Sequence, residues 1–362
     1  MAGGIQPISI LDEFYRYNHW ANWKVLELCD GLRDTQLDEP KDLGFGTLRN
    51  TLFHILAAEE VWWERWNQIP PRPFPLDAGT LPVDEISRRL DDINTRRSDW
   101  LDEIGDSGLA TLCSYQDSKG TAYSNPLKEL LVHVANHGVH HRAQALRYLK
   151  GFGRTRRGGI DHLFFRFANP SISQPIESVA AMRQYGLECL TGVSPQIVWD
   201  KPLIERFFAY GDWATEKLML LADQLSDSHL DHDFQMGPGS IRKTLLHLFD
   251  AENFWVSNWT TGESHFSFVP LTTSIDELKG SRVEMVQTRN RFVAEQDSHS
   301  VSRILKASFG GPEFLVPTIE SMTQVCMHGT HHRAQLCNML RHSGIKLPAT
   351  DYVVWAREEN RV

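Results

Sequence analysis

The chain has 362 residues, 41% of them hydrophobic and 23% charged, and its formal net charge is -9 at pH 7. This length exceeds what a single hydrophobic core usually organises, so we expect two domains. A net negative charge argues against a nucleic-acid partner, because phosphate binding needs a clustered excess of lysine and arginine. The one basic run, RTRR at 154–157, is short and is predicted to be a solvated turn.

The chain shows no sign of export or membrane insertion. No stretch approaches the roughly 20 apolar residues that cross a bilayer, so we expect no membrane partner. The first residues, MAGGIQPISIL, lack the basic and then apolar order of a secretory signal. The five cysteines are odd in number and lack the spacing of a disulfide framework. We therefore expect a reduced, cytoplasmic protein.

The first half of the chain predicts four helices. Apolar residues recur with helical spacing in four segments, at about 8–32, 47–68, 83–104 and 126–150. In the first segment, Leu11, Phe14 and Tyr15 follow the spacing of one buried face. Thr47 precedes the second segment as an N-cap residue would. Between the third and fourth segments, the stretch CSYQDSKGTAYS predicts a short β-hairpin or flap.

The second half repeats the first in the same order. GTLRNTLFHILAAEEVWWERW at 46–66 aligns without a gap to GSIRKTLLHLFDAENFWVSNW at 239–259. NHGVHHRAQ at 136–144 aligns to MHGTHHRAQ at 327–335, and YNHWAN aligns more weakly to YGDWAT. Three collinear matches indicate a duplication. We therefore predict an all-α protein of two tandem four-helix bundles, each with a short β-hairpin or flap between helices three and four.

The domain boundaries follow from the repeat. We predict the first copy at residues 1–170 and the second copy at residues 199–362. The linker between them, residues 171–198, mixes proline, serine and glycine, and one short helix is predicted near 176–188.

Three histidines recur at matched positions in each copy. His137 and His141 are four residues apart on a predicted helix, so their side chains share one face. His54 on the second helix can supply a third imidazole, and neutral imidazole is a common ligand of zinc, nickel, copper and iron. Three protein ligands leave coordination positions open, as in catalytic zinc sites. We predict one divalent metal ion per domain, with the ligands His54, His137, His141, His247, His328 and His332.

Other histidines near these positions carry weaker signals. His133 stands four residues before His137 and can support the ligands, but the second copy has Gln324 at that position. His140 and His331 each precede a predicted ligand, roughly 100° around the helix, so we expect them to face a neighbouring helix or solvent.

The remaining conserved polar residues of the repeat have two interpretations. No glutamate stands between the paired histidines, so this is not the HExxH motif of zinc proteases. Glu59 and Glu252 lie roughly 140° around the helix from the nearest predicted ligand, which favours ion pairing over a role as a base. An arginine and a glutamine that follow the last ligand of each copy either hydrogen-bond to the ligands or, as we slightly favour, tie helices together. These residues are Arg142, Gln144, Arg333 and Gln335.

YNHWAN on the first helix, TLFHILAAE on the second and NHGVHHRAQ on the fourth make the chain resemble the DinB/YfiT-like superfamily of metal-binding four-helix bundles, over nearly all of both halves. The resemblance implies a divalent metal, zinc or nickel and sometimes iron, held by the three histidines of each copy. Some relatives are transferases or isomerases that use bacillithiol, mycothiol or glutathione. Single-domain relatives often form homodimers, so the tandem domains are expected to form an intramolecular pseudo-dimer. The second copy departs from the first-helix motif, with Gly211 and Asp212 in place of Asn18 and His19.

These observations favour a metal-dependent transferase that uses a low-molecular-weight thiol as cosubstrate against an electrophilic small-molecule substrate. One alternative is a non-enzymatic, stress-related protein that binds a metal or a small ligand. Another is a metal-dependent hydrolase that activates a bound water. In any of these, either both copies work or only one does.

Overall fold

The computed structural model describes residues 8–70, 72–117, 119–155, 159–168, 196–263, 266 and 268–359. The chain forms two compact units. The first unit contains Leu11–Thr155 together with Pro348–Val362, and the second contains Arg156–Leu347 together with Met1–Ile10. The predicted helix near 176–188 lies outside the described residues, as does most of the predicted linker.

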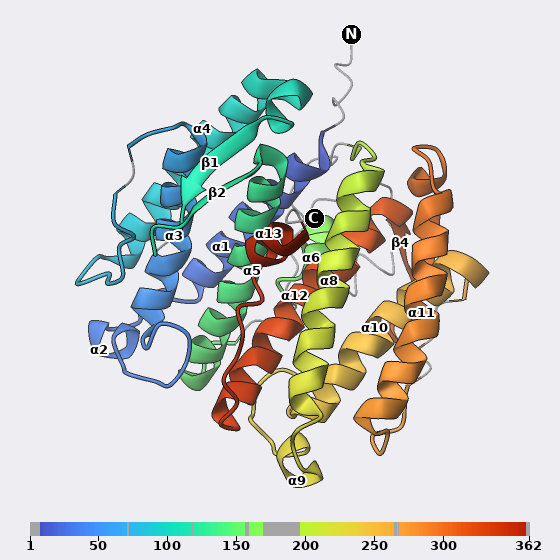
Figure 1. Cartoon of the computed structure of the whole chain (residues 1–362). Coiled ribbons are helices and arrows are strands. Elements are labelled where there is room, and N and C mark those ends of the chain that lie inside the picture. Colours follow the sequence, from blue (N-terminus) through green and yellow to red (C-terminus); the bar gives the residue numbers. More distant parts are fainter. Residues whose placement is uncertain are drawn as a thin grey trace. The chain divides into compact units, whose positions relative to one another are not determined.

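Four long helices form the first unit, as predicted (Figure 1). They are α1 (Ile10–Glu27), α3 (Leu48–Trp66), α4 (Val83–Leu109) and α5 (Leu127–Gly151). A short helix, α2 (Asp34–Leu37), precedes α3, and the side chain of Thr47 accepts a hydrogen bond from the backbone N–H of Asn50 to cap α3. The predicted hairpin is present as β1 (Leu112–Gln116) and β2 (Ala122–Pro126), antiparallel with Cys113 opposite Asn125.

The second unit repeats this arrangement (Figure 1). Its long helices are α8 (Lys201–Ala222), α10 (Ile241–Thr261), α11 (Ile275–Glu295) and α12 (Thr318–His342), and its hairpin consists of β3 (Ile304–Ala307) and β4 (Phe314–Pro317). Two shorter elements are α9 (Asp227–Leu230) and the 3-10 turn η1 (Ser300–Ser302). Ser240 caps α10, and Ser274 with Glu277 forms a capping box at the start of α11.

The long helices bury their apolar faces against one another. In the first unit α3 packs on α4 and α5, and in the second unit α10 packs on α11 and α12. Fully buried leucines such as Leu48 and Leu56 on α3 follow the spacing that predicted this helix. Polar contacts also fix α1 on α5, because the Tyr15 hydroxyl donates to the carbonyl of Leu131 and the Asn18 amide donates to that of Ala135. The predicted all-α fold is therefore confirmed.

Each unit also contains a short helix from elsewhere in the sequence, because that helix comes directly after the long helices of the other repeat. Helix α6 (His162–Ala168) comes after α5 but belongs to the second unit, where the Leu163 N–H donates to Gln324 and Arg166 pairs with Glu320. Helix α13 (Tyr352–Glu359) comes after α12 but belongs to the first unit. There the Tyr352 hydroxyl donates to Glu129 at 2.9 Å. The units therefore do not coincide with uninterrupted stretches of sequence.

Two further observations bear on membrane insertion and on the state of the cysteines. Within the part of the chain that the structure describes, no helix combines the length and apolarity needed to cross a membrane. The described cysteines are buried and carry free thiols; they are Cys29, Cys113, Cys326 and Cys337.

Candidate metal centre

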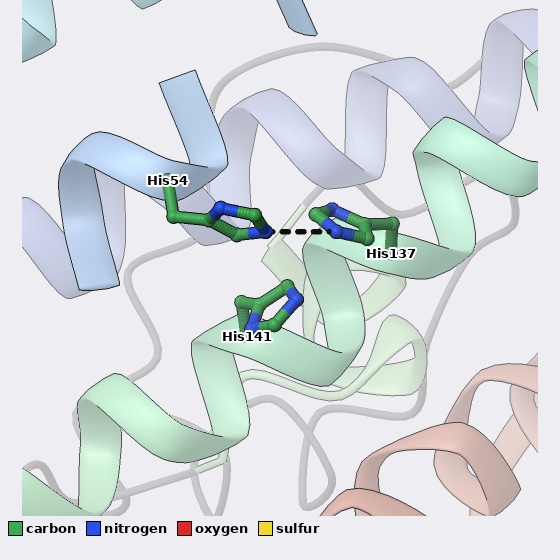
Figure 2. Close-up of side chains that lie close together, drawn as sticks. All are labelled: His54, His137 and His141. Carbon is green, nitrogen blue, oxygen red and sulfur yellow. Dashed lines mark hydrogen bonds between the residues drawn. The ribbon is translucent and has the colours of Figure 1, made fainter. Parts of the chain in front are cut away.

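The three predicted histidines of the first repeat converge on one point. His54 extends from α3, and His137 and His141 extend from consecutive turns of α5 (Figure 2). The Nε2 atoms of His54 and His137 lie 3.1 Å apart, and one ligand nitrogen from each of the three rings lies within 4.8 Å of the others. Phe45 stacks on the His54 ring with centroids 3.8 Å apart, which restrains this imidazole.

The donor set fits a divalent metal ion. Zinc–nitrogen bonds of about 2.0–2.1 Å in tetrahedral geometry put two ligand nitrogens about 3.3 Å apart, close to the separation of the His54 and His137 atoms. Burial lowers the pKa of His54 to about 4 and lowers the pKa values of His137 and His141 well below their usual range. The imidazoles are therefore neutral at pH 7 and keep the lone pairs that a metal needs.

The second repeat builds the same cluster. His247 on α10 meets His328 and His332 on α12, and the Nε2 atoms of His247 and His328 are again 3.1 Å apart. The ligand nitrogens of this set also lie within 4.8 Å of one another. Burial lowers the pKa of His247 to about 4 and that of His332 well below its usual range. Both repeats thus offer a comparable three-nitrogen site.

A glutamine in each repeat orients the last histidine. The Nδ1–H of His141 donates to Oε1 of Gln144 at 2.8 Å, which leaves Nε2 free to face the centre of the cluster. The Gln144 amide in turn donates to Nε2 of His140 at 3.3 Å. The second repeat has the equivalent contacts, from His332 to Gln335 at 2.8 Å and from Gln335 to His331 at 2.9 Å. The glutamines therefore act on the histidine clusters, and our preference for a role in tying helices together was wrong for them.

The arginine of the same motif does tie helices together. Arg142 is fully buried and donates to Asn22 at 2.9 Å and to Asn18 at 2.5 Å, both on α1. His140 and His331 hold the orienting glutamines, a role that the sequence pattern did not predict.

An aspartate that sequence analysis missed supports the second cluster. The Nδ1–H of His328 donates to Oδ2 of Asp161, at 3.3 Å, and this carboxylate is 22% exposed. Burial alone would raise the pKa of Asp161, but the hydrogen bond from the His328 ring outweighs it, and the pKa is lowered to about 2. Asp161 is therefore ionised and fixes the orientation of His328, as carboxylates commonly do for metal-binding histidines.

The first unit places a matching aspartate near its own cluster. Asp351 precedes α13 as Asp161 precedes α6, and its charge opposes the effect of burial on the pKa of His54. The signal that sequence analysis missed is this match, since each aspartate follows the last histidine of a repeat by nearly the same number of residues.

His133 lies beside the first cluster. It is buried, and its ring packs edge-on against Trp62 and lies 5.7 Å, centre to centre, from the ring of His137. Burial lowers its pKa to about 4, and its Nδ1 atom has no hydrogen-bond partner among the described residues. In the second unit Gln324 occupies the equivalent position and instead receives the backbone N–H of Leu163. The two clusters thus differ in their surroundings.

The glutamates of the second helices form ion pairs, as predicted. Glu59 pairs with Arg97, and both side chains are buried. Glu252 pairs with Arg289, which also binds Asp212 at 2.5 Å. Both glutamates are therefore held away from a role as a base at the histidine clusters.

The metal-free protein is expected to lose stability as the pH falls from about 6.5 towards 4. An unfolded chain protonates its histidines near pH 6.5. His54 and His247 stay neutral in the fold until about pH 4, so over this window the unfolded state binds more protons and the free energy of unfolding decreases. Urea titrations of metal-free protein from pH 7 to 5 measure this slope. A variant with His54→Asn and His247→Asn serves as the control and should show a flatter slope; equal slopes would contradict the prediction.

Comparison with known proteins identifies the family. The DinB family model matches the chain twice, at residues 7–172 and 200–361. No curated protein and no solved structure matches it. The two matched regions cover most of the chain and contain all six histidines of the clusters. The chain therefore belongs to the DinB family and carries two tandem copies of its domain.

Proposed function

We propose that the protein is a metal-dependent transferase that joins a small thiol to an electrophilic substrate. The observation that carries this proposal is the pair of clusters, each with three imidazoles whose ligand nitrogens lie within 4.8 Å of one another. Three ligands of this kind suit zinc or nickel, with iron as a third choice, and leave open positions. Free thiols at the described cysteines agree with a reducing cytoplasm.

The residues of the chain define what each site contributes. A divalent ion at the cluster would supply a Lewis-acid position at which a thiol ionises at neutral pH. Gln144 holds His141, and Asp161 and Gln335 hold His328 and His332, so the ligand nitrogens keep their directions. The thiol loses its proton to solvent, and its sulfur forms a bond to the electrophilic carbon. In a substitution the bond from that carbon to the leaving group breaks and both electrons leave with that group; in an addition the electron pair of the broken π bond takes a proton from water.

Hydrolysis is less well supported than thiol transfer. A metal-bound water is most effective with a nearby base, and the glutamates closest to the clusters along α3 and α10 are already paired with arginines.

The test uses untagged, full-length protein loaded with zinc or nickel. We expect it to consume monochlorobimane in the presence of bacillithiol, mycothiol or glutathione, and we expect EDTA or the double variant His137→Ala with His328→Ala to abolish this activity. The matched control is His299→Ala, which removes an exposed histidine outside both clusters. If the protein binds metal but consumes no monochlorobimane with any of the three thiols, the transferase proposal is overturned. The alternative of a stress-related binding protein then remains.

A further inference from the structure

A cavity of about 240 Å³ lies beside the histidine cluster of the second unit. Its lining includes His247, His328 and Asp161, so one end of the cavity is formed by the cluster and the aspartate that supports it. An apolar cavity of about 150 Å³ is enough to bind benzene, so this one can take a larger ring system.

The residues of the first unit that match one part of this lining enclose little space. Asn22, Leu90 and Arg142 help to line a cavity of about 10 Å³ there, barely the room of one water molecule. Asn18 and Asn22 accept hydrogen bonds from Arg142, and all three side chains are buried.

Substitutions at matched positions open the space in the second unit. Gly211 and Thr215 stand where the first repeat has Asn18 and Asn22, and both line the large cavity. Arg282 stands seven residues before Arg289, as Leu90 stands seven before Arg97.

Arg282 does not fill the opened space, because ion pairs draw it to Asp212 and to Glu252. The difference in volume between the two units is therefore encoded by the residues that the repeats do not share.

Aromatic rings form much of the cavity wall. Phe254 stacks on Phe266 with centroids 4.6 Å apart and contacts Phe309 at 5.4 Å. Phe309 lies after β3 and is 47% exposed, so it marks the side where the cavity meets solvent. Such faces favour stacking with a planar aromatic ligand.

The charges in the cavity wall compensate one another. Arg289 and Arg282 pair with Asp212 and Glu252, giving two guanidinium groups for two carboxylates. Asp161 and Arg333 also line the cavity and again carry opposite charges, so the wall has no excess charge and offers little attraction to an ionic ligand.

We propose that the cavity of the second unit binds the neutral, aromatic body of the electrophilic substrate, at about the size of two fused rings, with its reactive end at the histidine cluster. The statement that the ligand is an electrophile rests on the proposed function. The statement that the cavity binds a neutral aromatic molecule does not. The second unit offers this room beside its cluster, whereas the matched residues Asn22, Leu90 and Arg142 of the first unit enclose only a small space.

Calorimetric titration of the metal-loaded full chain with 2-naphthol tests the proposal. We expect binding that is at least tenfold weaker when Gly211→Asn and Thr215→Asn restore the residues of the first repeat. A Cβ at position 211 would meet Arg333 at 3.5 Å, an ordinary contact, so the helix can accept a side chain there. Glu216→Asn on the exposed side of α8 is the control and should bind as the parent does.

A second variant tests the same cavity in case the Gly211→Asn, Thr215→Asn variant does not fold. Phe309→Ala alters an exposed residue at the opening and should also weaken 2-naphthol binding, while metal content stays at the parent value. No binding to the parent, or equal binding to the parent and to both variants, would overturn the proposal. If the parent protein binds 2-naphthol but catalyses no thiol transfer, only the proposed function is overturned. If it catalyses thiol transfer but does not bind 2-naphthol, only the cavity assignment is overturned.

Discussion

A chain carrying His137→Ala is expected to retain one divalent ion where the parent chain holds two. His137 and His54 present nitrogens 3.1 Å apart, and removing one imidazole leaves two ligands from α3 and α5. Two neutral nitrogens hold a divalent ion far more weakly than three, and the restraint that Gln144 places on His141 cannot replace the missing donor. The measurement is metal content per chain by mass spectrometry, on protein purified without a histidine tag.

The second repeat provides the matched variant. His328→Ala should also leave one ion, and the double variant should leave none, because the two clusters use separate ligands. His299→Ala controls for the loss of an exposed histidine. Two ions in the double variant would refute both sites, and a single ion in the parent would show that one copy has ceased to bind metal.

Glu59→Leu is expected to lower the free energy of unfolding by about 3–5 kcal/mol, because removal of one member of a buried ion pair leaves the other charge without compensation. The side chains of Glu59 and Arg97 are 4% and 3% exposed, so water cannot take over the lost contact. The Arg97 guanidinium also lies 3.8 Å from the centre of the Tyr15 ring, which fixes it inside the bundle. Urea unfolding followed by circular dichroism measures the change.

Glu252→Leu is the internal comparison for this prediction. Arg289 would still be paired with Asp212, and the Glu252 and Asp212 side chains are 14% and 26% exposed. The second variant should therefore unfold at a urea concentration closer to that of the parent. Equal loss in both variants would show that burial and the second carboxylate do not decide the effect.

Much of the architecture was predictable because the duplication repeats every local signal. The spacing of apolar residues predicted the long helices, Thr47 predicted the start of α3, and the intervening stretch predicted β1 and β2. The six histidines could be singled out because each occurs at a matched position, and the structure brings them together in two sets.

The surroundings of the clusters were less accessible from sequence. The role of Gln144 depends on which way its side chain turns on α5, and the spacing of residues does not determine this. Asp161 was missed because it follows the first repeat and yet supports a histidine of the second. The cavity also depends on packing, since the exchange of Asn18 for Gly211 is visible in the sequence but the space it leaves is not.

The two short helices that belong to the opposite unit have an evolutionary consequence. A gene fragment that began at the second family match would encode His247, His328 and His332 but not Asp161 or α6. A fragment that ended with the first match would lack Asp351 and α13. Splitting the duplicated gene into separate single-domain genes would therefore separate Asp161 from His328 and Asp351 from the cluster that contains His54, which favours inheritance of the pair as one reading frame.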